Sequence, residues 1–448
     1  MIHRLRPVLF VLFAILLVVP APAQEHLAPL AKLELEDGDT LVFLGDSITH
    51  QCLYTQYVED YFYTRFPGKR IKFHNAGVNG ARAIDALDRF DRDVASYKPK
   101  YVTVLLGMND GSYQPYKEEV FQTYHKDMTE LIARIEKIGA APILMTPTMF
   151  DSRAARLRKR ASTPDKLELY NSVLAYYGTW LREVAVESGH GFVDMYSPLN
   201  HLTLQQRKAN PNFTLITDSV HPDAPGQLVM AFAILEDMGA QRQVSNIRIL
   251  AAGAKPRPQA NGGKVSDLSV TADGLSFTWS ANSLPWVVPE EAQSGAKLLR
   301  LGHRMSREAL EVHGLPAGSY QLSIDGEVVG TYSSVQLSRH IELQENAKTP
   351  QHEQAARVAQ LNKERNAGPV KSLRNEWSTF QRYSRAARKS AAAPDDAKFK
   401  AQALALKARL EGMEGRAAEH QRAAAEIEAK IFQTNQPKPR RYDLEKVK

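Results

Sequence analysis

The chain has 448 residues, of which 43% are hydrophobic and 24% are charged, and this balance excludes wholesale disorder. The length exceeds that of one ordinary domain and predicts two or three domains. Cys52 is the single cysteine in the sequence. An intramolecular disulfide framework and a cysteine-based zinc site are therefore both excluded.

The net charge of +7 is distributed unevenly along the chain. Residues 24–348 carry 34 basic and 38 acidic side chains, which gives a net charge of −4. Residues 349–448 carry 21 basic and 12 acidic side chains, which gives a net charge of +9. The basic character of the sequence therefore belongs to its C-terminal tail and not to its main body.

Residues 1–23 have the pattern of a secretory signal peptide, for which we expect cleavage after Ala23. Two arginines precede an apolar run over residues 8–19, which is shorter than the roughly 20 residues that a membrane-spanning helix needs. An uncleaved anchor is the alternative, and no cysteine follows at which a lipid could be attached. Export without disulfides is typical of a bacterial periplasmic or extracellular protein.

Residues 24–238 alternate between short apolar runs and amphipathic stretches. We expect strands at 41–44, 71–73, 101–106, 142–145 and 191–193, and helices at 51–65, 83–96, 117–138, 166–187 and 225–237. Five such pairs predict an α/β fold, with a mainly parallel sheet of about five strands covered by helices on both faces. Because ligands bind beyond the carboxyl ends of the strands in such sheets, we expect the chemistry there.

Polar or flexible residues follow the first three predicted strands at Ser47, Gly80 and Asn109. Each of them also has a purely structural interpretation. Ser47 suits a helix N-cap, Gly80 suits a turn, and Asn109 can bond its own backbone in a turn. None of the three identifies a site by itself.

A fourth segment, residues 217–226, precedes the last predicted helix and contains Asp218 and His221. An aspartate and a histidine three residues apart can share one turn, so that the carboxylate orients the imidazole and leaves its other nitrogen free as a base. A Ser–His–Asp set requires convergence in space and no particular chain order. All four segments end on the same rim of the predicted sheet, and together they predict nucleophilic catalysis by a serine.

These four segments resemble the sequence blocks of the SGNH/GDSL hydrolases. The matching blocks are Gly45–Ser47, the glycine block that ends at Gly80, Gly107–Asp110 and Asp218–His221, all within residues 37–238. The expected fold is therefore a flavodoxin-like three-layer α/β/α sandwich. Such hydrolases act on ester bonds, and no metal or other cofactor is expected.

The resemblance also implies a role for each candidate site residue. Ser47 would be the nucleophile, His221 the general base and Asp218 its orienting partner. The oxyanion hole would consist of the backbone N–H groups of Ser47 and Gly80 and the side-chain amide of Asn109. This assignment agrees with the chemistry of the residues, because a serine hydroxyl needs a base and the developing oxyanion needs fixed donors.

The features that bear on the substrate are a basic run and several tyrosines near the predicted rim. Residues 151–160 follow the fourth strand and form either a solvated loop or a cationic cover in which Arg156, Arg158 and Arg160 bind an anionic glycan. Four tyrosines either line a sugar-binding cleft or pack in the core: Tyr54, Tyr57, Tyr113 and Tyr116.

The esterase-like domain is expected over residues 24–250, and the composition of the sequence changes beyond it. Residues 251–263 are rich in Pro, Gly and Ala and predict a linker. Residues 264–348 contain alternating runs and a hairpin signal at Asp325-Gly326, which predict a small β-rich module that binds carbohydrate or packs on the catalytic domain.

Residues 349–448 predict a basic helical tail with little strand signal. We expect a break at 391–394 and a longer helix over 396–432, arranged as a solvated helical hairpin on the body. An anionic polysaccharide or envelope surface is the alternative partner of this tail. The secretory pattern argues against a nucleic acid, and none is expected.

The sequence as a whole predicts an exported serine esterase, and an acetylesterase acting on an acylated carbohydrate is the favoured interpretation. The preference for acetyl esters is an inference from the family and not from the residues. A lipid, aryl or thioester acylhydrolase with the same triad remains an alternative, with another small ester as substrate. A non-catalytic glycan-binding or scaffold protein is the second alternative, and the oligomeric state is left open.

Overall fold

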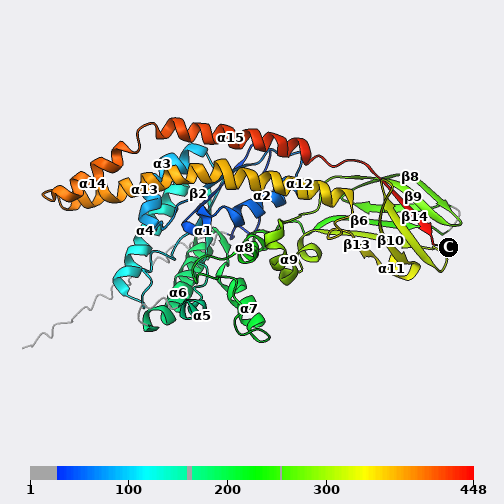
Figure 1. Cartoon of the computed structure of the whole chain (residues 1–448), viewed down its shortest axis with the longest axis horizontal. Helices are drawn as coiled ribbons and strands as arrows, with labels where there is room; N and C mark the ends of the chain where they lie inside the picture. The colour runs from blue at the N-terminus through cyan, green and yellow to red at the C-terminus, as the bar shows by residue number, and fades with distance from the viewer. Residues whose placement is uncertain (1–27, 159–163, 253–254, 448) are drawn as a thin grey trace, which may run out of the picture.

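The computed structural model describes residues 28–158, 164–252 and 255–447, so the expected signal segment 1–23 and Arg160 lie outside the described residues. Along the chain, an α/β domain is followed by a β-sandwich and then by long helices that return over the α/β domain (Figure 1). The last strand of the chain ends inside the β-sandwich. The C-terminal tail therefore connects the two other parts of the molecule.

The α/β domain is built on five parallel strands in the order β2-β1-β3-β4-β5. Their bounds are β1 (Thr40–Gly45), β2 (Lys72–Gly77), β3 (Tyr101–Leu105), β4 (Ala141–Met145) and β5 (Gly191–Val193). This is the flavodoxin-like order, in which the direction of winding changes between β1 and β3 and opens a crevice at their carboxyl ends. The predicted fold class and its five strands are confirmed.

Helices cover both faces of this sheet because each strand buries alternate side chains in two separate cores. Leu41 and Phe43 contribute to one core, and their neighbours Val42 and Leu44 contribute to the other. The first core is completed by α2 (Leu53–Arg65) and α8 (Ala224–Asp237), and the second by α3 (Ala83–Asp93), α4 (Glu118–Lys137) and α6 (Pro164–Ser188). Shorter elements are α1 (Ser47–His50), η1 (Ala95–Tyr97), α5 (Ser152–Leu157) and α7 (Tyr196–Arg207).

The β-sandwich consists of a four-stranded sheet, β13-β10-β6-β7, and a five-stranded sheet, β12-β11-β14-β9-β8. Their strands are β6 (Gln243–Leu250), β7 (Arg257–Asn261), β8 (Gly263–Thr271), β9 (Gly274–Ala281), β10 (Arg307–His313), β11 (Ser319–Ile324), β12 (Glu327–Ser333), β13 (Ile341–Glu342) and β14 (Arg440–Lys446). Asp325 and Gly326, with φ of 51° and 86°, form the predicted tight turn between β11 and β12. Between β9 and β13 lie η2 (Glu290–Ala292), α9 (Gln293–Leu299), α10 (Leu301–Met305) and α11 (Ser334–Arg339).

Part of the segment expected to be a linker, residues 251–263, is strand. Pro258 lies in β7, an edge strand, which is the position within a sheet that tolerates a proline. Gly262 has a φ of +82°, and a Cβ there would lie 2.1 Å from the carbonyl oxygen of Val244. The Pro- and Gly-rich composition therefore reflects an edge strand and a tight turn.

The tail forms the predicted helical hairpin, but it also contains a strand that the sequence did not predict. Its helices are α12 (Pro350–Arg365), the π-helical turn η3 (Asn366–Val370), α13 (Lys371–Ala392), α14 (Ala397–Ala408) and α15 (Met413–Thr434). The break after α13 is confirmed, whereas the helix expected over 396–432 is divided at Gly412, which has a φ of +71°. Strand β14 pairs with β9 and β11 and buries Tyr442 and Leu444 in the sandwich core.

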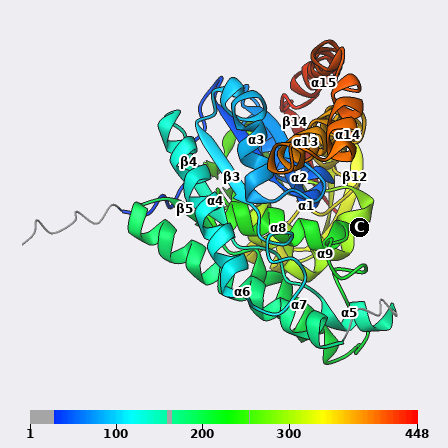
Figure 2. The same cartoon turned by 90° about the vertical axis from the view of Figure 1, so that its left-hand side faces the viewer.

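Buried polar contacts attach the tail helices to the α/β domain. Both guanidinium nitrogens Nη1 and Nη2 of Arg374 lie 2.9 Å from the carboxylate of Asp93, and both side chains are fully buried. Arg365 on α12 pairs with the buried Glu59 of α2 at 3.1 Å. Figure 2 shows the tail helices beside α2 and α3 and away from α6. The tail is therefore an integral part of the fold and not a solvated appendage.

Candidate active site

The turn after β1 presents Ser47 at the carboxyl edge of the sheet. Gly45 ends the strand, and a Cβ there would lie 2.1 Å from Thr49 Oγ1 and 3.0 Å from the Leu105 carbonyl oxygen. Asp46 caps the short helix α1, because its Oδ1 accepts a hydrogen bond of 2.9 Å from the N–H of Ile48. Ser47 is therefore the first residue of a helix at the crevice between β1 and β3.

The structure brings Ser47, His221 and Asp218 into one hydrogen-bonded chain. Ser47 Oγ lies 2.8 Å from His221 Nε2, and Asp218 Oδ2 lies 2.6 Å from His221 Nδ1. If Nδ1 carries the imidazole proton and donates a hydrogen bond to the carboxylate, Nε2 is free to accept the proton of the serine hydroxyl. The sequence prediction that these residues converge agrees with this geometry.

A tight turn fixes the carboxylate of Asp218 beneath the imidazole. Its Oδ1 accepts hydrogen bonds from the backbone N–H groups of Val220 at 2.9 Å and of His221 at 2.7 Å. Partial burial acts to raise the pKa of Asp218, but these hydrogen bonds and the contact with the His221 ring outweigh it and lower the pKa below its usual value. The carboxylate is consequently ionised at neutral pH and able to stabilise an imidazolium.

Gly80 and Asn109 line one cavity of about 610 Å³, and none of Ser47, Asp218 and His221 is among the described residues that line it. Asn109 Nδ2 lies 3.4 Å from Asp46 Oδ2 and 3.1 Å from the Ala81 carbonyl oxygen, so this amide lies beside the turn that carries Ser47. Gly80 has a φ of +66°, and a Cβ there would meet no protein atom within 4 Å. Its backbone conformation, and not crowding by the protein, therefore favours glycine at this position.

Two buried carboxyl groups border the amide of Asn109. Burial raises the pKa of Asp46 to about 6, although the N–H of Ile48 partly offsets this. Burial also raises the pKa of Asp110 to about 7, against hydrogen bonds from the backbone N–H groups of Ala83 and Gly107. Raised pKa values reduce the negative charge near the amide, which favours the binding of an anion there.

A family model for the GDSL-like lipase/acylhydrolase family matches residues 43–229, a range that contains all the residues of this site. The part of the chain that carries these residues, 43–229, is therefore an SGNH/GDSL hydrolase domain. It is a carboxylic ester hydrolase, in agreement with the resemblance that the four sequence blocks carry. Within the described residues, no helix is both long and apolar enough to cross a membrane.

Comparisons with individual proteins extend this likeness. The chain is 26% identical over 229 residues to an acetylxylan esterase from Geobacillus stearothermophilus, covering 46% of this chain and 97% of that protein. It is 36% identical over 76 residues to an uncharacterized lipoprotein of Bacillus subtilis (strain 168), covering 16% of this chain and 30% of that protein. The solved structure of a gut microbial diltiazem-metabolizing enzyme superposes with a TM-score of 0.77 at 26% identity, covering 94% of this chain and all of that chain. That likeness includes the β-sandwich and the tail helices as well as the GDSL domain.

Helix α13 of the tail contacts the loop that carries Gly80. Gln381 Nε2 donates to the carbonyl oxygen of Asn79 at 2.9 Å, and Arg385 Nη2 donates to that of Gly80 at 2.6 Å. Arg385 also pairs with the buried carboxylate of Asp85 at the start of α3. The sequence prediction placed the tail on the body without a role in the site, and it missed these residues.

The basic run after β4 lies apart from this cavity. Residues 152–157 form helix α5, on which Arg156 pairs with Glu168 at 2.6 Å, and the following Arg158 is exposed. Neither arginine is among the described residues that line the cavity, and Arg160 lies outside the described residues. A role for these arginines in binding substrate stays a prediction.

Of the four tyrosines considered for a sugar-binding cleft, Tyr113 lines the cavity, where its hydroxyl lies 3.3 Å from Asn109 Oδ1. Tyr54 and Tyr57 are fully buried and pack in the core, which excludes them from a cleft. Tyr116 is exposed and bonds Glu118. Their positions favour the packing interpretation for Tyr54 and Tyr57.

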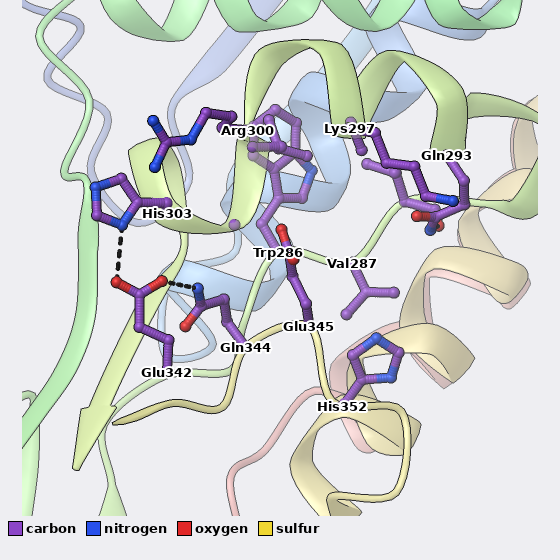
Figure 3. Close-up of a pocket in the computed structure, with 14 residues that line it drawn as sticks. Trp286, Val287, Gln293, Lys297, Arg300, His303, Glu342, Gln344, Glu345 and His352 are labelled. Atoms are coloured by element: carbon purple, nitrogen blue, oxygen red, sulfur yellow. Dashed lines mark hydrogen bonds and ion pairs between the residues drawn. The ribbon is translucent and has the colours of Figure 1, made fainter. Parts of the chain in front are cut away.

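A second cavity, of about 710 Å³, lies at the junction of the β-sandwich, α9 and α12 (Figure 3). In this cavity Glu342 accepts hydrogen bonds from His303 at 2.7 Å and from Gln344 at 2.8 Å, and Trp286 lies beside them. None of the described residues that line it belongs to the triad or to the candidate oxyanion donors. It is therefore separate from the site of the GDSL domain.

Proposed function

We propose that this chain is an exported serine esterase that removes acetyl groups from a carbohydrate. The observation that carries the proposal is the chain of hydrogen bonds from Ser47 through His221 to Asp218, with distances of 2.8 and 2.6 Å. The acetylxylan esterase relative supports a carbohydrate acetyl ester as the substrate. The lipoprotein relative and the signal pattern in residues 1–23 support export.

The proposed reaction begins when Ser47 Oγ attacks the carbonyl carbon of the ester and His221 Nε2 takes the hydroxyl proton. Asp218 holds the imidazole and stabilises its positive charge. The tetrahedral oxyanion binds to the N–H groups of Ser47 and Gly80 and to Asn109 Nδ2, whose bond to Asp46 is long enough at 3.4 Å to be exchanged. The bond between the carbonyl carbon and the sugar oxygen then breaks, and His221 gives the proton to this departing oxygen, which leaves as a hydroxyl.

Hydrolysis of the acyl-enzyme repeats these steps with water as the nucleophile. His221 takes a proton from the water as it attacks the carbonyl carbon of the acetyl group on Ser47. The oxyanion binds to the same donors, and its collapse returns the proton to Ser47 Oγ and releases acetate. Apart from this water molecule, the proton transfers through His221 balance both halves of the reaction.

Replacement of the nucleophile tests the proposal. We expect Ser47→Ala to lower the turnover of 4-nitrophenyl acetate by at least about 10³-fold with an unchanged melting temperature, because losses in a triad are typically orders of magnitude. Ser338→Ala is the matched control, since Ser338 is half-buried on helix α11 of the β-sandwich, where its hydroxyl bonds the Val335 carbonyl oxygen. Turnover above about a tenth of the wild-type value in Ser47→Ala would exclude Ser47 as the nucleophile.

Two further measurements separate the alternatives to this function. A series of 4-nitrophenyl esters of increasing acyl length distinguishes an acetylesterase from a lipid, aryl or thioester acylhydrolase, because an acetylesterase loses activity as the chain lengthens. A fluorophosphonate probe that reacts with activated serines labels an esterase at Ser47. It leaves a non-catalytic glycan-binding protein unlabelled.

A further inference from the structure

The cavity beside the triad is lined jointly by the GDSL domain and by the tail. Gly80, Arg82 and Asn109 line it from the GDSL domain, and Arg385, Arg388 and Lys389 line it from α13. The same cavity therefore contains two of the three candidate oxyanion donors and four basic side chains, whereas Ser47 is not among the described residues that line it. A group bound by these side chains lies in the same cavity as Asn109, whose amide contacts Asp46, the residue before Ser47.

The charges around this cavity do not cancel. Asp85 accepts hydrogen bonds from Arg385 at 2.5 and 3.0 Å and from Arg388 at 2.7 Å, and Asp88 pairs with Arg388. Those two carboxylates therefore balance the two arginines of α13. Arg82 and Lys389 remain as two additional positive charges.

Arg82 and Lys389 are both exposed, and neither forms an ion pair within the part of the chain that the structure describes. Arg82 Nη2 donates to the neutral hydroxyl of Ser112 at 3.3 Å, and its charge also acts on the buried carboxyl of Asp110, whose pKa burial raises to about 7. Lys389 is close to the C-terminal end of α13, which ends at Ala392. Both residues line the cavity and can contact a ligand without first giving up an ion pair.

We infer that this cationic recess, formed by Arg82 and Lys389 with Arg385 and Arg388, binds a carboxylate on the substrate. The substrate class is an acetylated glycan that contains a uronic acid, with the carboxylate held by the recess while the acetyl ester lies at Ser47. This inference rests on the proposed function and adds the charge of the substrate to it. A cavity of about 610 Å³ falls in the range of small-ligand sites.

The location of the recess explains why the basic tail is attached to a domain with a net negative charge. Residues 24–348 carry −4, so the body as a whole does not attract an anionic polymer. Exposed charges act over about 8–10 Å at ordinary salt, so only a basic group close to the triad can influence capture there. Helix α13 brings such groups to the edge of the loop that carries Asn79 and Gly80, which we call the oxyanion loop.

The test compares two substrates that differ only in the carboxylate: an O-acetylated methyl glucuronoside and the matching O-acetylated methyl glucoside. We expect the wild-type enzyme to have a higher kcat/KM for the glucuronoside. The ratio of the two values should fall about threefold to fivefold in Lys389→Gln and further in Lys389→Glu, as is typical for loss of one exposed charge contact. High salt should lower the ratio in the wild-type enzyme, because it screens the attraction.

Arg382→Gln is the matched control, because Arg382 is exposed on the same helix and bonds only Ser378 and Thr379 of α13 itself. It should keep the wild-type ratio. Hydrolysis of both sugar esters with a ratio that neither Lys389→Gln nor Lys389→Glu changes would overturn the recess and leave the proposed function standing.

A binding measurement separates the recess from the carbohydrate activity. Methyl glucuronoside should inhibit the hydrolysis of 4-nitrophenyl acetate more strongly than methyl glucoside, and Lys389→Glu should remove the difference. If neither sugar ester is hydrolysed but this inhibition is present, the carbohydrate acetylesterase function is wrong and the recess is supported. Absence of the inhibition in the wild-type enzyme would overturn the recess.

Discussion

Replacement of Arg385 by methionine should slow the chemical step, because Arg385 holds the oxyanion loop from the side of the tail. Its Nη2 donates to the Gly80 carbonyl oxygen at 2.6 Å, while Nε lies 3.0 Å from Asp85. The N–H of Gly80 shares a peptide plane with the Asn79 carbonyl, which Gln381 binds, and Arg385 binds the carbonyl of the next peptide plane. Gly80 joins these two planes with a positive φ and no side chain, so their relative orientation depends on contacts of this kind. Arg385 is therefore a positioning residue for the N–H of Gly80.

The expected loss is smaller than that of an oxyanion donor itself. Removal of a donor lowers kcat by about 10²–10³-fold. Arg385→Met leaves the N–H of Gly80 in place, and Gln381 still holds the neighbouring carbonyl of Asn79 at 2.9 Å. We therefore expect kcat to fall about tenfold, which corresponds to about 1.4 kcal/mol of transition-state stabilisation. KM for a small acetyl ester should stay close to the wild-type value.

The assay is the steady-state hydrolysis of 4-nitrophenyl acetate, with melting temperatures measured on the same preparations. Arg385→Lys should recover part of kcat, because the ammonium keeps one hydrogen bond to the loop but loses the paired geometry on Asp85. Arg382→Met, on an exposed face of the same helix, is the control for general effects on α13. A wild-type kcat in Arg385→Met together with a lower melting temperature would refute the argument and leave Arg385 with a purely structural role.

Two further predictions concern the attachment of the tail. Removal of residues 350–448 should prevent folding, because it takes Arg365 from the buried Glu59, Arg374 from the buried Asp93 and β14 from the middle of a five-stranded sheet. A soluble product with a cooperative melting transition would contradict this. The second concerns acid: burial acts to raise the pKa of Asp93, but Arg374 and His74 lower it to about 2. The stability that this ionised carboxylate contributes is complete above its usual pKa of 3.8 and is lost as the pH falls toward 2. Arg374→Met should therefore lose stability at a higher pH than the wild type, which melting temperatures measured between pH 2 and 7 will show. Identical dependence of the melting temperature on pH in the two proteins would contradict this linkage.

The sheet and the triad were predictable because their signals are local. Strands of a parallel sheet are buried on both faces, so β1 and β3 stand out as continuous apolar runs. The site residues follow these runs directly, as Ser47 and Asn109 do, and parallel strands bring their carboxyl ends to one edge. Asp218 and His221 are three residues apart, so their contact also depends on local geometry alone.

The strand β14 and the edge strand β7 were not predictable in this way. β14 pairs with β9, which is about 160 residues earlier in the chain. Its seven residues, Arg440–Lys446, are too polar to suggest a strand in the middle of a sheet. Only Tyr442 and Leu444 show the alternation, and their burial depends on a sheet that the rest of the chain must form first. Strand β7 could not be predicted because it contains Pro258, and a proline argues against a strand unless the strand lies at an edge of the sheet.

The contact of α13 with the active site did leave a trace in the sequence. Arg374, Gln381, Arg385 and Arg388 are separated by seven, four and three residues, so they lie on one face of the helix. A basic helix on the surface of a protein usually directs such residues to solvent, and composition alone cannot distinguish that case from a polar face buried against acidic partners.

The partners of this face connect the tail to the turn that carries Ser47 as well as to the loop that carries Gly80. Arg374 pairs with Asp93, Asp93 accepts from Arg89 Nε at 3.2 Å, and Arg89 Nη2 donates to the carbonyl oxygen of Gly45 at 3.2 Å. Gly45 is the residue from which the turn to Ser47 begins. Because these side chains are buried, a displacement of α13 leaves charged groups without partners and is costly. The tail thus contributes to the geometry of the candidate site at both the turn of Ser47 and the loop of Gly80, although it lies outside the range of the GDSL family model.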